Sequence, residues 1–395
     1  MNTLVVTEEY GKLTKGMFRV WSLVCSRGGH GQSVELLINR EHWLKEKVTV
    51  GSMEGITKLH YYPLLMPQTI AVGVFSVLGN NLLAGALRFA LRNLLNLLTM
   101  PLFTVWLMSL VRRRGVTHLV CHHGGWPGGA FVRWAILASR LAGVRKSILV
   151  IHSFPAPYSR LFKCLQRLEE RVIGKCASEI VTVSHAAAAA LAQRNFGKPV
   201  KVIHNGLPIA TPMLAGGAAE QQDGALIGFL GALVPNKGAH VLLDAALLLP
   251  PGCRLALAGP GDGGYIACLR AHPATALHEI LFSGNLEDVG AFLARVDVLV
   301  VPSIRFEAFG MVILEAMQYS KPIICSDFGG MKEIVVDGET GCIVPAGDAG
   351  ALASAIRKLL ANPALRQRMG AAGNARLIEF FNAERMVAKY AALLM

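Results

Sequence analysis

Residues 297–316 read Asp-Val-Leu-Val-Val-Pro-Ser-Ile-Arg-Phe-Glu-Ala-Phe-Gly-Met-Val-Ile-Leu-Glu-Ala, and they join a strand pattern to a helix pattern. The first part, Asp297–Pro302, has the length and the β-branched content of a buried parallel strand. The last part is apolar and helical, and it carries Glu315 among apolar neighbours, where a carboxylate is costly unless a donor meets it. Glu307 lies in the loop between them, where the first N–H groups of the helix point toward an anion. Because hydroxyls need acceptors and phosphates need amides or cations, this arrangement suits a sugar nucleotide.

The composition fits a globular protein with two domains of ordinary size. The chain has 395 residues, of which 53% are hydrophobic and 16% are charged, and this balance excludes disorder. Its eight cysteines form no C-x-x-C pair and follow no regular spacing, so we interpret them as buried apolar residues in a reducing compartment. The first residues lack a basic segment followed by an apolar one, and we therefore expect a cytoplasmic protein that is not secreted.

Positive charge is concentrated in the first half of the chain. The net charge is +13, and residues 1–205 hold 25 Lys and Arg against 9 acids, whereas residues 206–395 hold 14 against 17. No acid occurs between Gly55 and Leu168. Such an asymmetry favours an anionic partner of the first half. Because the sequence has no zinc-finger spacing and no RRM-type aromatic motif, an anionic membrane or a phosphorylated acceptor is favoured over nucleic acid.

One segment, Leu94–Val111, is uncharged and mostly apolar, is interrupted by Asn96 and Thr99, and has arginines on both flanks. Its length alone is enough to span a bilayer, but Pro101 is expected to break it, and it leads directly into a predicted strand. Three interpretations remain at this point. They are a buried helix of the first domain, an interfacial helix with basic flanks that dips into a membrane, and a transmembrane span, which is the least favoured.

Strand-like and helix-like runs alternate along both halves, and this order predicts parallel sheets covered by helices on both faces. The expected strands are Phe18–Val24, Thr117–Cys121, Lys146–Ile151, Glu179–Val183, Val200–Ile203, Ala225–Leu230, Arg254–Ala258, Ile280–Phe282, Val298–Val301, Pro322–Cys325 and Cys342–Val344. Residues 206–224 have the proline, glycine and polar content of a linker. We therefore predict two doubly wound α/β domains, 1–205 and 225–375, with ligands at the carboxyl ends of their strands. A helix over 376–395 is expected to pack back on the first domain.

Three loops that follow predicted strands carry candidate ligand-binding residues. Gly28 and Gly29 precede a predicted helix over Ser33–Asn39, where glycine lets the backbone approach a phosphate, although a tight turn explains them equally well. Lys237 opens another predicted helix, where a cation is badly placed unless an anion compensates it, and a solvated surface lysine is the alternative. His152 ends a strand and either donates to a substrate hydroxyl or is a core histidine satisfied by the backbone.

A fourth loop, Cys121–Gly129, surrounds Trp126 with glycines, and this pattern predicts close approach to a flat sugar face. The same stretch contains His122 and His123. Adjacent histidines point apart on extended backbone, so a two-histidine metal site is not expected there. Since the chain also has no D-x-D pair, the sequence predicts no catalytic metal.

Taken together, these residues resemble the GT-B glycosyltransferases of family 4, a large retaining family that uses nucleotide-diphosphate sugars. Glu307 and Glu315 match the family's E-x7-E signature. Further segments match in order, at 183–184, 202–206, 254–262, 282–284, 329–341 and 344–348. The resemblance covers most of the chain and is strongest from Ile227 to Ile356. It implies the GT-B architecture, in which two Rossmann-like domains, the first for the acceptor and the second for the nucleotide sugar, face a central cleft.

The resemblance also implies roles for the matching residues of the second domain. Glu307 would contact hydroxyls of the donor sugar, Glu315 would hold the ribose, and Lys237 would neutralise the departing diphosphate. The amides that would assist Lys237 belong to Phe309, Gly310 and Met311.

In the first domain, the resemblance implies that His152 contacts the donor sugar. It also implies that Gly28 and Gly29 let the acceptor-side loop approach the diphosphate. One position of the second domain departs from the family pattern, because Gly231-Ala232-Leu233 stands where many relatives have Gly-Arg-Leu. Either Arg305 or an arginine of the first domain replaces the missing charge, or the diphosphate is held less strongly.

The resemblance predicts a retaining, metal-independent hexosyltransferase that needs no cofactor beyond its nucleotide-sugar donor. The basic first half and Leu94–Val111 favour a glycan acceptor that is lipid-linked, at the inner face of the cytoplasmic membrane, as in surface-polysaccharide or lipopolysaccharide assembly. Two alternatives stay open. The acceptor is a soluble glucan or disaccharide precursor, or the chain is a sugar-nucleotide-binding protein with weak catalysis, which Ala232 makes conceivable.

Overall fold

The computed structural model describes residues 2–8, 33–39, 58–62, 82–127, 130–160, 162–209, 224–305 and 307–395. The chain forms two compact units, which interrupt each other in sequence. Unit 1 comprises Met1–Val183, Ala188–Ile203 and Val387–Met395, and unit 2 comprises Ser184–Ala187 and His204–Met386. The predicted Gly28, Gly29 and strand Phe18–Val24 lie outside the described residues, as does most of the predicted linker.

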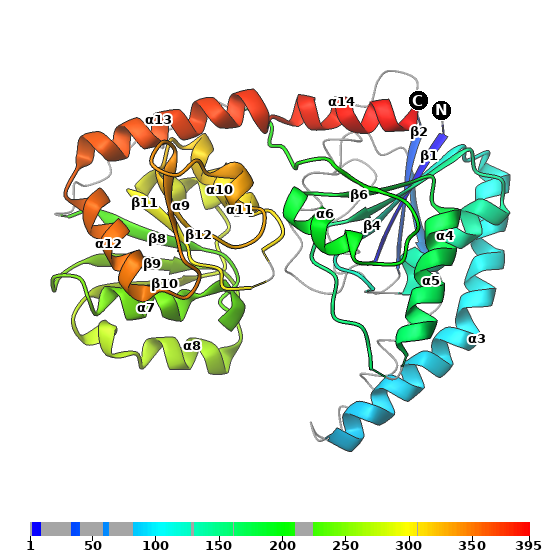
Figure 1. The fold of residues 1–395 in the computed structure, drawn as a ribbon, viewed down its shortest axis with the longest axis horizontal. Coiled ribbons are helices and arrows are strands. Elements are labelled where there is room, and N and C mark those ends of the chain that lie inside the picture. Colours follow the sequence, from blue (N-terminus) through cyan, green and yellow to red (C-terminus); the bar gives the residue numbers. More distant parts are fainter. Residues whose placement is uncertain are drawn as a thin grey trace. The chain divides into compact units, whose positions relative to one another are not determined.

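The described residues of unit 1 form a parallel sheet of seven strands in the order β3-β2-β1-β4-β5-β6-β7 (Figure 1). These strands are β1 (Asn2–Glu8), β2 (Ser33–Asn39), β3 (Lys58–Tyr62), β4 (His118–His123), β5 (Lys146–Ile151), β6 (Glu179–Thr182) and β7 (Val200–Val202). The helices are α3 (Leu82–Arg114), α4 (Ala130–Leu141) and α5 (Lys163–Cys176), together with α6 (His185–Ala192), whose first residues up to Ala187 belong to unit 2. The inner strands β4 and β5 are buried almost throughout, as expected of a parallel sheet covered on both faces.

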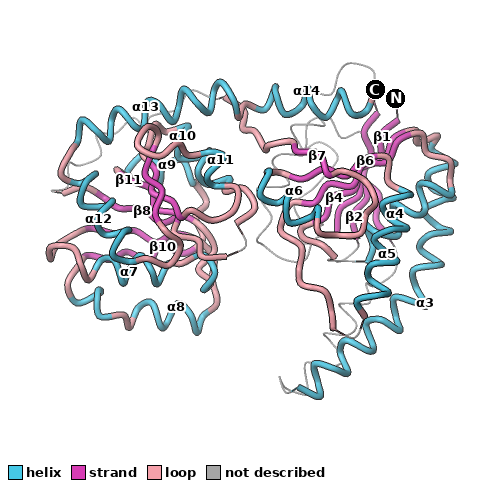
Figure 2. The backbone as a smooth tube through the Cα atoms, in the orientation of Figure 1, coloured by secondary structure: helices cyan, strands magenta, loops and turns pink. Residues whose placement is uncertain are grey.

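Within residues 224–305 and 307–386, unit 2 has a second parallel sheet, of six strands in the order β10-β9-β8-β11-β12-β13. Figure 2 shows the strands in magenta and the helices in cyan. Its strands are β8 (Leu226–Leu230), β9 (Arg254–Ala258), β10 (Glu279–Gly284), β11 (Val298–Val301), β12 (Ile323–Ser326) and β13 (Gly341–Val344). Helices lie on both sides of this sheet (Figure 1). They are α7 (Ala239–Ala246), α8 (Gly263–Arg270), α9 (Val289–Arg295), α10 (Met311–Gln318), α11 (Met331–Ile334), α12 (Ala349–Leu360) and α13 (Pro363–Phe380), with the short turns η4 (Pro235–Lys237) and η5 (Pro273–Ala276).

The predicted GT-B type of architecture, two doubly wound parallel sheets, is confirmed, but the helix predicted over Ser33–Asn39 is not. Ser33–Asn39 was expected to be a helix and is strand β2, which pairs with β1 and β3. A short apolar run of this length fits either element by its pattern alone, and pairing with two neighbouring strands decides the outcome. The structure also contains β1 and β3, for which no strand was predicted.

The predicted C-terminal helix over 376–395 is the end of α13 followed by α14 (Ala383–Leu394). The two helices are separated by Phe381 and Asn382. The last residues, Val387–Met395, belong to unit 1, where Lys146 Nζ donates to the carbonyl of Leu393 at 3.2 Å.

Helix α3 contains the whole apolar segment Leu94–Val111, and Pro101 lies inside it, so the expected break does not occur. The residues on either side of the proline, Met100 and Phe103, are buried in the core, and this packing offsets the local cost of a proline inside a helix. One side of the helix is in the core, where Phe103 is fully buried, whereas the adjacent Leu102 is 62% exposed. Among the described residues, no helix has the combination of length and apolarity that crossing a bilayer requires.

Within unit 2, Glu333 of α11 binds the first residues of α6. One carboxylate oxygen of Glu333 accepts the backbone N–H of Ala186, and the other accepts the N–H of His185 and pairs with His204 Nε2, all at 2.9 Å. Burial acts to raise the pKa of Glu333, but these hydrogen bonds outweigh it and hold the pKa below the ordinary value of 4.5. This carboxylate explains why Ser184–Ala187 fold with unit 2.

We predict that Phe103→Ala lowers the free energy of unfolding by about 3–5 kcal/mol, since it leaves a cavity in the core. The matched change Leu102→Ala, on the neighbouring residue of the same helix, should cost less than about 0.5 kcal/mol. Urea denaturation of both variants measures the difference. Equal losses of unfolding free energy in the two variants would contradict the assignment of one buried and one exposed side to α3.

We also predict that Glu333→Gln lowers the free energy of unfolding at pH 7 by about 1–2 kcal/mol, because two helix amides and His204 lose an anionic acceptor. The depressed pKa contributes stability that is present above the ordinary value of 4.5 and is lost as the pH falls through the folded value. The difference in the free energy of unfolding between wild type and Glu333→Gln should therefore become smaller below about pH 4.5.

Calorimetry between pH 7 and pH 4 checks this narrowing, with the exposed Glu287→Gln as the control. A gap between wild type and Glu333→Gln that does not change with pH would show that the charge of Glu333 is not what stabilises the contact.

Candidate active site

The order of strands in unit 2 reverses between β8 and β11, which are neighbours in the sheet although they are far apart in sequence. Ligands of doubly wound folds bind at such a point, in the crevice outside the carboxyl ends of the strands. Lys237 lies in the loop after β8, and Glu307 lies in the loop after β11. Two of the predicted site residues are therefore positioned by the two strands that flank the reversal.

Main-chain contacts hold these two loops together. The carbonyl of Asn236 accepts the N–H of Ile304 at 2.9 Å and that of Arg305 at 3.3 Å. Gly238 is in the left-handed conformation at φ +74°, and a Cβ at this position would lie 1.9 Å from the carbonyl oxygen of Pro302. Only glycine allows this approach. Lys237 itself ends the turn η4, and α7 begins at Ala239, so the lysine precedes the helix and does not open it as predicted.

Lys237 and Glu307 form an ion pair. Lys237 Nζ donates to Glu307 Oε2 at 2.5 Å, and Ser303 Oγ donates to the same oxygen at 3.1 Å. The lysine side chain is 27% exposed and the glutamate side chain 13%, so the pair is partly desolvated but open to solvent on the lysine side. The pair thus brings a cation and a hydroxyl acceptor to one place. Sequence reasoning did not identify Ser303, although its position directly after Pro302 at the strand end was the available signal.

The N-terminus of α10 follows this loop directly. Gly310 precedes the helix in the left-handed conformation, and no side chain caps the helix start. Its first amides, predicted to bind an anion, therefore have no side-chain acceptor at the cap position. Phe309 is buried and packs on His204, with ring centroids 5.8 Å apart, whereas Met311 is half-buried. Glu315, predicted to be a buried carboxylate, is half-buried, because it lies on the side of α10 that the core does not cover.

In unit 1, the order of strands reverses between β1 and β4, and His152 follows β5, the next strand. His152 Nε2 shares a hydrogen bond of 2.8 Å with Nδ1 of His122, a buried residue of β4 that sequence reasoning did not assign to the site. Burial lowers the pKa of His152 to about 3 and that of His122 well below 6.5. Both rings are therefore neutral at pH 7, and His152 Nδ1 is the nitrogen it offers to a ligand as donor or acceptor, according to the tautomer.

The interpretation of Trp126 as a sugar platform is wrong. Trp126 is 1% exposed, its Nε1 donates to Glu170 Oε1 at 2.9 Å, and its ring lies edge-on to Phe196. Gly124 and Gly125 therefore precede a core residue, whereas Gly128 and Gly129 lie outside the described residues. His123, the neighbour of His122, contacts this tryptophan, with ring centroids 5.8 Å apart.

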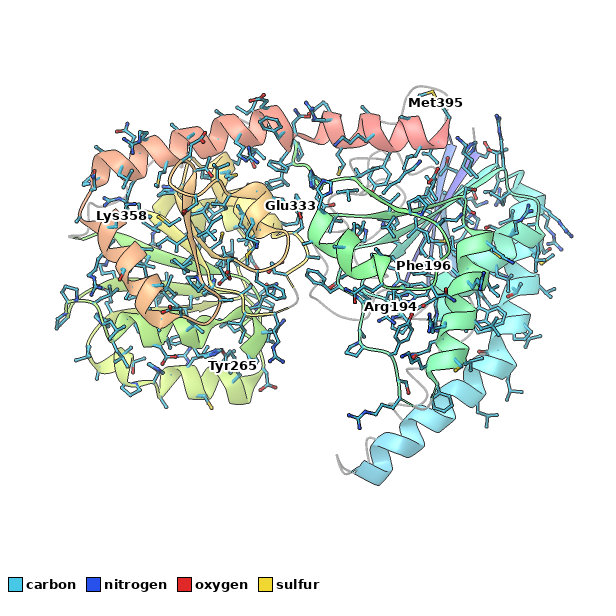
Figure 3. All side chains as sticks on the ribbon, viewed as in Figure 1. Arg194, Phe196, Tyr265, Glu333, Lys358 and Met395 are labelled. Carbon is cyan, nitrogen blue, oxygen red and sulfur yellow. The ribbon has the colours of Figure 1, made fainter. Side chains whose placement is uncertain are left out.

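Glu170 of α5 is a buried carboxylate that organises the loops of this region. Besides Trp126, it accepts Tyr158 Oη at 2.5 Å, the N–H of Asn195 at 2.9 Å and Arg194 Nη1 at 3.3 Å (Figure 3 labels Arg194). A buried charge is tolerated when it is paired and hydrogen-bonded in this way. Because Tyr158 lies in the loop that begins at His152, the network fixes the course of that loop.

One cluster among the described residues has the donor set of a metal site. The ligand atoms of His185, His204 and Glu333 lie within 4.8 Å of one another. Both oxygens of Glu333 already accept hydrogen bonds from backbone or ring N–H groups, so the cluster is satisfied without an ion. That the chain uses no catalytic metal stays a prediction.

Comparison with known proteins agrees with this geometry. Residues 72–211 match the family described as Glycosyltransferase Family 4, and residues 217–376 match the family described as Glycosyl transferases group 1. The phosphatidyl-myo-inositol mannosyltransferase of Mycobacterium leprae is 36% identical over 192 residues, which cover 45% of this chain and 49% of that protein. The O-antigen chain mannosyltransferase C of Escherichia coli is 28% identical over 258 residues, which cover 63% and 68%. The chain thus spans about half the length of the first curated relatives that it matches.

Among solved structures, Anabaena Alr3699/HepE in complex with UDP matches with a TM-score of 0.74 at 18% identity, over 99% of both chains. At this identity the likeness shows the fold alone. The two family matches together extend from residue 72 to residue 376, and the fold agrees with them. The chain therefore belongs to the glycosyltransferases of the family 4 type, with the GT-B architecture.

Proposed function

We propose that the chain is a retaining glycosyltransferase that moves a hexose-type sugar from a nucleotide-diphosphate sugar to a glycan acceptor. The observation that carries this proposal is the Lys237–Glu307 pair at the strand reversal of unit 2, next to a helix start without a side-chain cap. A cation and amides suit a diphosphate, and a carboxylate suits sugar hydroxyls. The structural likeness to a protein solved with UDP supports a nucleotide-sugar donor.

Donor binding would exchange the partners of the ion pair. In the free chain the charge of Lys237 is compensated by Glu307, at 2.5 Å. A diphosphate carries more negative charge than one carboxylate, so Lys237 would turn to the phosphate, and Glu307 would then accept a hydroxyl of the donor sugar. The amides of Phe309, Gly310 and Met311 would receive a phosphate oxygen, and Glu315, further along α10, would hold the ribose.

Transfer then requires stabilisation of the leaving group more than a protein base. The bond from the anomeric carbon to the phosphate oxygen breaks, and the acceptor oxygen bonds to the same face of the sugar. The acceptor proton passes to an oxygen of the departing diphosphate. Lys237 would stabilise the charge that develops there. In unit 1, we propose that the neutral His152 offers Nδ1 to a hydroxyl of the donor sugar. We also propose that Gly28 and Gly29 let the backbone of their loop approach the diphosphate.

The charge missing at Ala232 has a candidate replacement in the same unit. Arg305 is exposed, and its backbone N–H is held by Asn236, the residue next to Lys237. We propose that its guanidinium supplies the second positive charge on the diphosphate. If it does not, the chain is the alternative considered above, a sugar-nucleotide-binding protein with weak catalysis.

For the acceptor, we propose a lipid-linked glycan in surface-polysaccharide or lipopolysaccharide assembly, at the cytoplasmic face of the membrane. The concentration of basic residues in residues 1–205 supports an anionic acceptor. The relative named for an O-antigen chain supports a surface glycan. A soluble glucan or disaccharide acceptor is the alternative.

We predict that Lys237→Ala and Glu307→Ala each lower kcat for transfer by about 10²–10³, because each removes a group that acts on the reacting donor. Both side chains are partly exposed, so the melting temperature should stay near that of wild type. The control is Lys358→Ala, an exposed lysine of α12 (Figure 3). Near-wild-type turnover in either of the first two variants would refute the assignment of the site.

The donor is identified by a thermal-shift screen of UDP-, GDP- and ADP-sugars, followed by product analysis with the donor that binds. We expect one nucleotide class to raise the melting temperature of wild type, and less so of Lys237→Ala, since bound ligand stabilises the folded state. Transfer or hydrolysis of that donor supports an enzyme. Binding without either would favour the sugar-nucleotide-binding protein.

A further inference from the structure

Helix α3 is apolar on two opposite sides, and only one of them is covered. The buried side contributes Met100, Phe103, Leu107 and Val111 to the core of unit 1. The other side carries an exposed stripe whose members are Leu94 (54% exposed), Leu98 (60%), Leu102 (62%) and Val105 (67%). Their spacing of four, four and three residues places them along one face. Leu94–Val111 therefore differs from two of the interpretations drawn from the sequence, the buried helix and the transmembrane span.

A second exposed apolar stripe lies on α5. Leu165 is 62% exposed, Leu168 is 60% exposed and Val172 is 40% exposed, again at helical spacing. Both α3 and α5 pack against α4 and lie on the outside of unit 1 (Figure 1). Single exposed leucines are ordinary on a protein surface, but two stripes on helices that share a neighbour mark an interaction site.

The charges beside these stripes are positive. The two acids of α5 are both compensated, since Glu169 pairs with Arg133 at 3.1 Å and Glu170 is buried in the network described above. What α5 exposes beside its stripe is a set of cations, Lys163, Arg167, Arg171 and Lys175. Helix α3 contains no acid, and it ends in Arg112, Arg113 and Arg114.

We propose that the exposed stripes of α3 and α5 dock on an anionic lipid surface, with the helices lying on the bilayer and not crossing it. Aliphatic side chains with flanking Lys and Arg are the composition of helices that bind at a membrane interface. One exposed aromatic, Phe162 (40% exposed), lies three residues before Leu165, and an aromatic ring beside leucines and flanking cations is also typical of helices that bind at a membrane interface. No uncompensated acid of α5 lies beside the stripes, so the charge favours an anionic surface as the partner. The inference deepens the proposed function, on which it rests only for the lipid-linked acceptor that such docking would bring within reach.

The test is co-sedimentation of the full chain with vesicles of phosphatidylcholine containing about one-third phosphatidylglycerol, and with vesicles of phosphatidylcholine alone. Binding to the anionic vesicles is expected at low salt, with weaker binding at about 0.5 M salt, where surface charges are screened. The double variants Leu98→Gln/Leu102→Gln and Leu165→Gln/Leu168→Gln should each lower the partition coefficient by about tenfold or more, since each removes two leucines from the interface.

The matched control is Leu248→Gln/Leu277→Gln, two leucines of unit 2 that are 52% and 46% exposed, and it should bind like wild type. A charge variant, Arg167→Gln/Arg171→Gln, should weaken binding and reduce its dependence on salt. Absence of wild-type binding at low salt, or equal losses in the stripe variants and the control, would overturn the proposal. The proposal would also be overturned if the chain does not bind vesicles but forms a dimer, seen by sedimentation velocity, that the α3 variant abolishes.

The donor-induced thermal shift of each variant keeps this proposal separate from the proposed function. It depends on unit 2 and should be the same in wild type and in the stripe variants. Loss of vesicle binding with an intact donor shift supports the docking surface. Vesicle binding without any donor shift would leave the surface standing and count against the proposed function.

Discussion

The site of unit 2 depends on how the loop that carries Glu307 is held. On one side its preceding residues donate N–H groups to the carbonyl of Asn236, and on the other the carbonyl of Glu307 accepts the N–H of Gly330 at 3.2 Å. Since these are main-chain contacts, they fix the loop whatever its exposed side chains are. Lys237 is thereby brought to Glu307 from a strand that is far away in sequence. A glycine at 238 is required because any larger residue would collide with Pro302.

Two further carboxylates organise the chain without belonging to the proposed chemistry. Glu170 collects four donors in the interior of unit 1 and determines the course of the loop after His152. Glu333 receives the first amides of α6 in unit 2. In each case several donors surround an acid that is buried, fully at Glu170 and partly at Glu333. The acids of the proposed site differ, since Glu307 has one cation and one hydroxyl that a ligand could replace.

The strands of the second half, and those from β4 onward in the first, were predictable because short continuous apolar runs between turn residues are a strong signal. The binding of a ligand anion by Lys237 stays a prediction, and the reason given for it was wrong, because the lysine precedes α7 and does not open it. Strand β2 was not predictable in this way, because a short apolar run suits a helix equally well until neighbouring strands pair with it. Trp126 looked like a ligand surface because glycines surround it, and only the distant Glu170 reveals that it is a core residue. The buried and the exposed side of α3 could not be told apart from the sequence, because both are apolar. Which side is exposed depends on where the rest of unit 1 packs against the helix.

The central claim is that Lys237 and Glu307 are partners only until a donor binds. The most direct measurement is a crystal structure of the chain with the nucleoside diphosphate of its donor. We expect Lys237 Nζ to leave Glu307 Oε2 and to donate to a phosphate oxygen, with another phosphate oxygen at the amides that begin α10. A bound nucleotide whose phosphates lie elsewhere, with the Lys237–Glu307 pair intact at 2.5 Å, would contradict it.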